Sequence, residues 1–251
     1  MKLLLSVNNY LQDVDPDNFA EFWKSSTNLI DGCEICCIIN DKNIDHIQRI
    51  AENTVKNDWI FQVHGDDLFD MSNRDILKNL MFYNRLAHVI NKRLNVTLHP
   101  SQNLNMWFMH KIDDLIHEND LKLLPVFENT ATKNCVTMLD DMLYKNLGFC
   151  WDIGHHVLVG ECEYELPENC RKYLKNIHIH DLNLTTFARL KGEVDHYPFD
   201  YGEVDYKKAI QYLKDIGYSG TVVLEIASDY LEDNKAMAFI KQFELIKEAA
   251  T

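Results

Sequence analysis

Short runs of apolar and β-branched residues alternate along the chain with longer segments in which apolar side chains recur at helical spacing. This alternation is typical of parallel strands joined by helical crossovers. The pattern predicts strands at Leu3–Val7, Cys33–Ile38, Ile60–His64, Val96–His99, Leu123–Glu128, Phe149–Asp152, Asn176–His180 and Thr221–Ile226. It predicts helices at Phe19–Ser25, Ile44–Lys56, Asn73–Arg93, Asn105–Glu118, Lys133–Asn146, Pro167–Lys175, Asp205–Ile216 and Asn234–Ala250.

Strands and helices in this strict alternation predict a closed (β/α)8 TIM barrel, because closure leaves no edge strand exposed. A chain of 251 residues is long enough for one such barrel. The sequence contains no internal repeat and no linker-like segment, so we expect a single domain over residues 1–251. Only one predicted connection is long, from Leu182 to Val204, and loops of that size are usually functional.

The composition fits a globular protein, with 46% hydrophobic and 25% charged residues. With 25 Lys and Arg against 39 Asp and Glu, the net charge of −14 disfavours binding to a phosphate backbone. No apolar run is long enough for a membrane span or a signal peptide, and seven cysteines without a regular framework fit reduced thiols. We therefore expect a cytoplasmic protein without a membrane partner. A monomer and a homo-oligomer are both compatible with the sequence.

Titratable residues stand at the ends of six successive predicted strands. They are His64, His99, Glu128, Asp152 with His155, His178 with His180, and Glu225. In a barrel these strand ends converge on the face where active sites are built. A buried, unpaired carboxylate costs on the order of several kcal/mol, and three of them at one mouth would repel each other. A bound cation removes both penalties, so the cluster predicts a metal site.

A single histidine at a strand end is more often a hydrogen-bonded loop residue than a ligand, so the interpretation depends on the whole cluster. Mixed oxygen and nitrogen donors suit Zn²⁺, Mn²⁺, Co²⁺, Ni²⁺ or Fe²⁺ better than Ca²⁺. His178 and His180 share one face of the seventh strand, and His178, the deeper of the two, is the predicted ligand. His156, next to His155, is expected to point away.

Several motifs together resemble one known superfamily. They are Phe127-Glu128-Asn129-Thr130, Trp151-Asp152-Ile153-Gly154-His155, His178-Ile179-His180-Asp181, Asp195-His196 followed by Gly202 and Asp205-Tyr206, and Gly217-Tyr218-Ser219-Gly220 before Leu224-Glu225. From about the third strand to the C-terminus, the chain resembles the xylose isomerase-like TIM-barrel superfamily. That superfamily contains sugar and sugar phosphate isomerases and epimerases, and also the endonuclease IV enzymes.

The resemblance implies a divalent metal ion (zinc, manganese, cobalt, nickel, magnesium or iron) held by Glu128, Asp152, His178 and Glu225. Glu128 and Glu225 would also be catalytic and exchange protons with the carbons beside the carbonyl of a sugar or sugar phosphate, through an enediolate. His155 would contact a substrate oxygen. Glu34 resembles a family position at the floor of the sugar site.

Endonuclease IV, a zinc phosphodiesterase that acts at abasic DNA sites, is the alternative. His64, His99, His155 and His196 match further ligand positions of its three-zinc cluster, so they are candidates for substrate binding or for a second metal. The net charge of −14 is unfavourable for gripping DNA. The branch also has an aspartate two residues before its loop histidine, where this chain has Val194. Both differences favour the isomerase or epimerase.

The chain departs from the ketose 3-epimerases as well. Asp181-Leu182-Asn183-Leu184 stands where they have an arginine shortly after the metal histidine, and Asp200 replaces a frequent loop glycine. These departures leave the identity of the sugar open. The cations expected nearest to a sugar phosphate are Lys133, Arg189 and Lys191.

Overall fold

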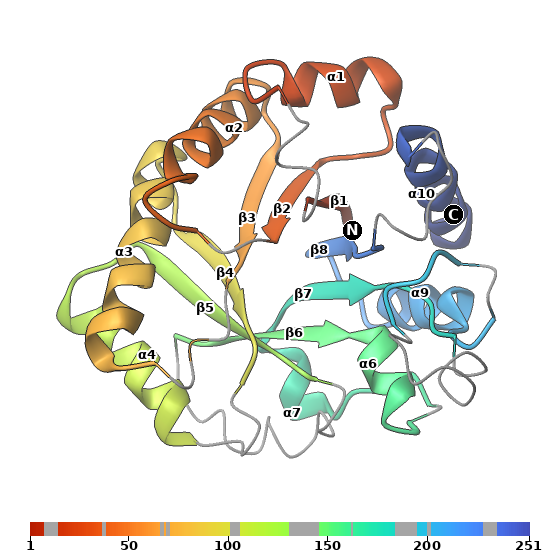
Figure 1. The fold of residues 1–251 in the computed structure, drawn as a ribbon. Coiled ribbons are helices and arrows are strands. Elements are labelled where there is room, and N and C mark those ends of the chain that lie inside the picture. Colours follow the sequence, from red (N-terminus) through yellow and green to blue (C-terminus); the bar gives the residue numbers. More distant parts are fainter. Residues whose placement is uncertain are drawn as a thin grey trace.

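Eight parallel strands close into a barrel in the order in which they occur along the chain (Figure 1). The computed structural model describes residues 1–7, 15–36, 39–65, 68, 71–100, 106–130, 146–161, 163–183, 195–199, 202–227 and 235–251. The strands are β1 (Lys2–Val7), β2 (Gly32–Cys36), β3 (Ile60–His64), β4 (Leu94–Leu98), β5 (Leu123–Glu128), β6 (Gly148–Asp152), β7 (Leu174–Ile179) and β8 (Thr221–Leu224). The predicted (β/α)8 fold class is confirmed.

The helices surround the barrel (Figure 1). They are α1 (Phe19–Ser26), α2 (Ile44–Lys56), α3 (Asn73–Val89), α4 (Met106–Glu118), α6 (Ile153–Leu158), α7 (Glu168–Arg171), α9 (Tyr206–Asp215) and α10 (Lys235–Ala250). The predicted helix at Lys133–Asn146 lies outside the described residues, apart from its last residue. Among these helices, none is long and apolar enough to cross a membrane.

The prediction of a helix through Lys175 was wrong at its C-terminal end. The helix ends at Arg171, because the carbonyl of Tyr173 accepts a hydrogen bond from the Phe149 N–H of β6 (2.7 Å). That bond starts the pairing of β7 with β6, so the backbone must already be extended there.

The hydrophobic core lies between the outer face of the barrel and the helices. Every second residue of a strand faces outward, and these residues are apolar. Trp151 of β6 packs edge-on against Tyr212 of α9, with ring centroids 5.7 Å apart. Phe127 of β5 packs against Phe108 of α4 at 6.3 Å. The apolar runs that predicted the strands are therefore used mainly outside the barrel.

The inside of the barrel contains a layer of polar side chains, here called the polar layer. Its members are Glu34, Gln62, Thr97, Asn176 and Thr221, all buried. Glu34 Oε2 accepts hydrogen bonds from Gln62 Nε2 (2.9 Å), Asn176 Nδ2 (2.9 Å) and Thr97 Oγ1 (3.3 Å). The Thr221 hydroxyl donates to Asn176 Oδ1 (2.7 Å). The polar layer therefore links β2, β3, β4, β7 and β8 across the barrel.

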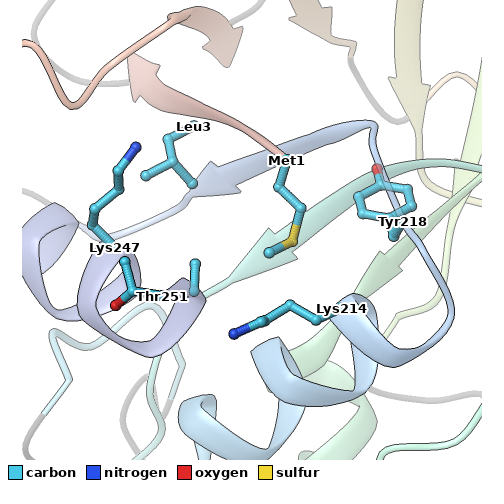
Figure 2. Close-up of a pocket in the computed structure, with 7 residues that line it drawn as sticks. Met1, Leu3, Lys214, Tyr218, Lys247 and Thr251 are labelled. Carbon is cyan, nitrogen blue, oxygen red and sulfur yellow. The ribbon is translucent and has the colours of Figure 1, made fainter.

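A surface pocket of about 360 Å³ opens at the N-terminal end of the strands (Figure 2). It is lined by Met1, Leu3, Lys214, Tyr218, Lys247, Ala250 and Thr251. These residues belong to the start of β1, the ends of α9 and α10 and the turn before β8. The pocket is thus at the opposite end of the barrel from the candidate residues described next.

Candidate metal centre

The strand ends place the predicted residues inside the C-terminal mouth of the barrel. His64, Glu128 and Asp152 are the last residues of β3, β5 and β6, and Glu225 follows β8 directly. All four are nearly inaccessible to solvent. Because strand residues alternate between the two faces, a polar residue at each of these positions must enter the barrel while its apolar neighbours meet the helices.

Four of the predicted residues form one group, here called the acid–histidine cluster: His64, Glu128, His178 and Glu225. Glu128 Oε2 lies 3.1 Å from His64 Nε2 and 3.2 Å from His178 Nδ1. His178 Nδ1 also lies 2.8 Å from Glu225 Oε2. The rings of His64 and His178 are stacked, with centroids 5.4 Å apart. Two carboxylates and one imidazole nitrogen therefore meet at one point.

Three buried ligand atoms of the cluster have no hydrogen-bond partner within the described part of the chain. They are Glu128 Oε1, His178 Nδ1 and Glu225 Oε2. The 2.8 Å contact between His178 and Glu225 does not have hydrogen-bond geometry, although it is short enough for one. Buried polar atoms are normally paired, and lone pairs that converge without a shared proton suit a bound cation. The residues present therefore fit a divalent metal ion.

Asp152 lies beside this cluster, and its imidazole partner is His180. Its carboxylate is 3.2 Å from His180 Nε2. The same carboxylate accepts the His155 backbone N–H (2.6 Å) and so caps the N-terminus of α6. Asp152 can share a cation with Glu128 and His155, because ligand atoms of these three residues also lie within 4.8 Å of one another. Glu128 is thus common to both groups.

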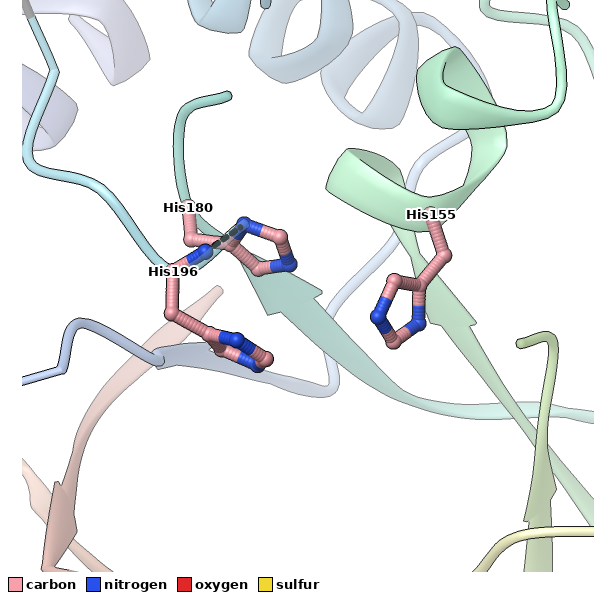
Figure 3. A group of neighbouring side chains, drawn as sticks. All are labelled: His155, His180 and His196. Atoms are coloured by element: carbon pink, nitrogen blue, oxygen red, sulfur yellow. Dashed lines mark hydrogen bonds between the residues drawn. The ribbon is translucent and has the colours of Figure 1, made fainter. Parts of the chain in front are cut away.

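A second group of imidazoles lies nearer the rim (Figure 3). His155 extends from α6, His180 follows β7 and His196 comes from the loop after it, and their ligand atoms lie within 4.8 Å of one another. The rings of His180 and His196 are stacked, with centroids 4.4 Å apart. The backbone of His196 has a positive φ of 59°, and its N–H donates a hydrogen bond to His180 Nδ1 (2.9 Å).

Asp195 joins this upper group, and the sequence analysis had assigned it no role. Its two oxygens lie 3.0 Å from His196 Nδ1 and 3.5 Å from His155 Nε2. Burial raises the pKa of the Asp195 carboxyl, but hydrogen bonds from His155 and His196 lower it more, so the net shift is downward. The sequence signal was the Asp195-His196 pair, one of the motifs that resemble the superfamily.

The electrostatics of the cluster keep its carboxyls ionised. Burial raises the pKa of Glu128, but the nearby His178, His155 and His64 bring it well below its usual range. Burial also raises the pKa of Glu225, but the nearby His178 lowers it more, so the net shift of the Glu225 pKa is downward. For His64, burial lowers the pKa, while the hydrogen bond to Glu128 raises it to a net value of about 9.

Two other predicted residues lie at the margins of the cluster. His99 Nε2 is 3.7 Å from Glu128 Oε2 on the more exposed side. Glu34 lies in the polar layer, with Oε1 2.8 Å from His178 Nε2. Their contact with a substrate stays a prediction.

The remaining candidates are His156 and the three cations considered for a sugar phosphate. His156 points away, as expected: its Nε2 lies 2.9 Å from the Glu163 carbonyl and its Nδ1 2.7 Å from Glu161. Lys133, Arg189 and Lys191, the cations considered for a sugar phosphate, lie outside the described residues.

One cysteine had not been associated with the site. Cys36 is on the interior face of β2, two residues after Glu34. Burial raises the pKa of its thiol, and Glu225 and Glu34 raise it further. These neighbours therefore keep the Cys36 thiol protonated when no metal ion is bound.

Comparison with solved structures gives the same fold throughout. A D-tagatose 3-epimerase-like protein is 19% identical, with a TM-score of 0.66 and full coverage of both chains. A 3-keto-D-glucoside 4-epimerase from E. coli is 14% identical, with a TM-score of 0.69 over 99% of each chain. The IOLI protein, whose structure has a bound zinc atom, is 14% identical, with a TM-score of 0.65 over 100% of this chain and 98% of the other.

Sequence comparison identifies the family. No curated protein matches the chain. Residues 102–249, which are more than half of the chain and include the motifs from Glu128 to Glu225, match the family described as xylose isomerase-like TIM barrel. The chain therefore belongs to the xylose isomerase-like TIM barrel family.

Proposed function

We propose that this protein is a divalent-metal-dependent isomerase or epimerase of a sugar or sugar phosphate. The observation that carries the proposal is the meeting of two buried glutamates, Glu128 and Glu225, at His178 Nδ1. Among the described residues, His178 Nδ1 and Glu225 Oε2 have no hydrogen-bond partner there, and neither has Glu128 Oε1, the oxygen on the side of His155. The proposal is supported by the folds of the two solved epimerases and of the IOLI protein with its zinc atom.

Glu128, Asp152, His178 and Glu225 would hold the ion. When bound, a divalent ion supplies Lewis-acid polarisation of the sugar carbonyl, which makes the neighbouring carbon more acidic. His178 fixes the distance between the two glutamates, since its Nδ1 lies within 3.2 Å of both carboxylates. Burial excludes water from these groups, so their electrostatic effects on a bound sugar are strong.

The two glutamates would move the proton. Glu128 comes from β5 and Glu225 from the end of β8, so a sugar bound between them has one carboxylate on each side. One carboxylate removes the proton from the carbon beside the carbonyl, and return from the other side inverts that carbon. Return to the adjacent carbon would convert ketose to aldose instead. The lowered pKa of both carboxyls leaves each in the form that accepts a proton.

The test begins with metal analysis of the purified protein. The metal-loaded protein is then incubated in D₂O with a panel of ketoses and ketose phosphates, and deuterium incorporation is followed by NMR. We expect exchange at the carbon beside the carbonyl for at least one sugar. Glu225→Gln should reduce exchange by at least about 10²-fold while the circular dichroism spectrum is unchanged.

Glu163→Gln is the matched control. Glu163 carries an exposed carboxylate, paired only loosely with Lys208 at 3.5 Å. This variant should exchange deuterium at the wild-type rate. If the metal-loaded wild type exchanges no deuterium into any sugar of the panel, the proposed function is wrong.

The endonuclease IV activity remains the second candidate, because His155, His180 and His196 with Asp195 form a further set of ligand types above the first. Zinc titration followed by metal analysis separates the two candidates. Three ions per chain together with nicking of an abasic duplex would establish the phosphodiesterase. A single ion per chain would exclude it.

A further inference from the structure

We propose that Glu34 is a positioning residue that holds His178 in one tautomer, with the proton on Nε2, so that the Nδ1 lone pair faces Glu128 and Glu225. The inference builds on the metal site of the proposed function and adds a residue beneath it. Glu34 would act through His178, without contact to the metal or the sugar.

The first observation is the contact itself. Glu34 Oε1 lies 2.8 Å from His178 Nε2, and both side chains are fully buried. A carboxylate oxygen can only accept a hydrogen bond. If Nε2 carried its lone pair toward Glu34, two lone pairs would face each other at this distance without water between them. The favourable arrangement is an Nε2–H that donates to Oε1.

The hydrogen bonds of the polar layer leave Oε1 to His178. The other oxygen, Oε2, already accepts from Gln62, Asn176 and Thr97. Among the described residues, Oε1 accepts no hydrogen bond of regular geometry, and its close contact is with the imidazole at 2.8 Å. Glu34 therefore has one oxygen for the polar layer and one for His178.

Asn176 is the other group close to His178 Nε2, at 3.1 Å from Nδ2. The Thr221 hydroxyl donates to Asn176 Oδ1, which fixes the orientation of the amide. Nδ2 then has two protons for three neighbours, which are Glu34 Oε2 (2.9 Å), His178 Nε2 (3.1 Å) and Thr97 Oγ1 (3.3 Å). An amide proton shared in this way is a weaker partner for Nε2 than a carboxylate oxygen at 2.8 Å, so Glu34 decides the tautomer.

The consequence lies on the other side of the ring. With the proton on Nε2, Nδ1 presents its lone pair at 2.8 Å from Glu225 and 3.2 Å from Glu128. A carboxylate that holds the distal N–H of a histidine ligand orients the ring and makes the free nitrogen more basic. Loss of such a partner typically weakens metal binding by about 10- to 100-fold.

The test compares zinc affinities of the metal-free wild type, Glu34→Gln and Thr97→Val by competition with a chromophoric chelator. In Glu34→Gln, the amide replaces one acceptor oxygen with a donor, so it cannot satisfy both His178 and the three donors. We expect affinity to fall by about 10- to 100-fold. Thr97→Val removes a donor to the same glutamate but leaves its contact with His178, so affinity should stay within about threefold.

A direct readout of the tautomer does not depend on any variant. Two-dimensional ¹H–¹⁵N NMR of the ¹⁵N-histidine-labelled, zinc-loaded wild type should show His178 protonated at Nε2 and bound through Nδ1, with His178→Asn used to assign the signal. A proton on Nδ1 would overturn the proposal, as would zinc affinity of a folded Glu34→Gln equal to that of the wild type.

The two measurements test the role of Glu34 independently of the proposed function, because neither uses a sugar. A wild type that binds zinc with the expected tautomer but never exchanges deuterium would remove the isomerase and leave the role of Glu34 intact. If the wild type exchanges deuterium but Glu34→Gln binds zinc as tightly as the wild type, the isomerase stands and the role of Glu34 is wrong.

Discussion

At position 154, the absence of a side chain decides where His180 can lie. A Cβ atom on Gly154 would be 2.1 Å from His180 Cε1 and 2.5 Å from Nε2. Real Cβ atoms do not approach other atoms so closely, so the imidazole occupies space that only glycine leaves open. Gly154 thereby permits the contact of His180 with Asp152 (3.2 Å).

Gly154→Ala should therefore displace the His180 ring and destabilise the protein by about 1 to 3 kcal/mol, the usual cost of overpacking a buried site. Urea denaturation measures the change. Gly160→Ala is the comparison: nothing lies within 4 Å of its Cβ, and only its φ of 88° disfavours a side chain, at a cost of about 1 kcal/mol. Equal or smaller destabilisation by Gly154→Ala would contradict the steric role assigned to Gly154.

The residue scale also shows what the sequence could and could not predict. Carboxylates at the ends of apolar strands were recognisable, because burial there demands a partner. The spacing along the strand placed His178 deeper than His180, but the carboxylate partner of each ring was not recognisable, since both residues have the parity that faces the interior. The contact of His180 with Asp152 depends on the height of the neighbouring strand and the direction of the ring, and neither has a signal in the sequence.

At the scale of elements, Asp181 organises the connection from β7 to α9. Its backbone N–H and carbonyl pair with those of Tyr197, at 2.8 and 3.0 Å. Its carboxylate accepts the N–H groups of Leu182 (2.8 Å), Gly202 (2.8 Å) and Val204 (2.9 Å). The bridge at Tyr197 fixes the residue immediately after His196. One buried carboxylate thus positions the described loop residues next to His196.

Asp181→Asn should weaken this connection, because one side-chain oxygen is replaced by an amide NH₂ group that faces backbone N–H donors. We expect stability to fall by about 1 to 3 kcal/mol, the cost of an unsatisfied buried polar group. Amide hydrogen exchange should accelerate at Gly202 and Val204. Asp205→Asn is the matched control, because Asp205 caps α9 by accepting the Lys208 N–H (3.0 Å), and asparagine caps helices about as well. Unchanged protection at Gly202 and Val204 in Asp181→Asn would show that another group holds the loop.

The elements themselves were largely predictable. The bounds of β3, β5 and α2 agree with their predicted ranges, because each has a clean pattern and a clear end. The boundary between α7 and β7 was misplaced. There the pairing of Tyr173 with Phe149, a contact between residues distant in sequence, overrides the local helical pattern.

At the scale of the whole molecule, the acid–histidine cluster joins β3, β5, β7 and the end of β8, so its charge state contributes to the stability of the barrel. In the metal-free protein, the pKa of His64 is raised to about 9 from its usual 6.5. A raised histidine pKa gives a stabilising contribution that is complete below about pH 6.5 and is lost as the pH rises through about 9. Glu128 and Glu225, with lowered pKa values, contribute above their ordinary pKa and lose the contribution only in acid.

The metal-free protein should therefore lose on the order of 2 kcal/mol of stability between pH 7 and pH 9.5 through His64, because its folded-state pKa of about 9 lies above the usual 6.5 and most of that difference falls within this interval. Urea denaturation of chelator-treated protein at the two pH values measures the loss. His64→Gln has no such group to deprotonate, so its stability should change less over the same interval. An equal decline in both proteins would assign the pH dependence to other groups.

The polar layer restricts which substitutions the interior of this barrel can accept during evolution. Glu34, Gln62, Thr97, Asn176 and Thr221 satisfy one another's hydrogen bonds, so replacement of any one of them by an apolar residue leaves buried partners unpaired. Substitutions at these five positions should therefore be inherited together rather than one at a time. Among relatives that diverge widely on the outer helices, the interior of the barrel should alternate between a few complete sets of residues.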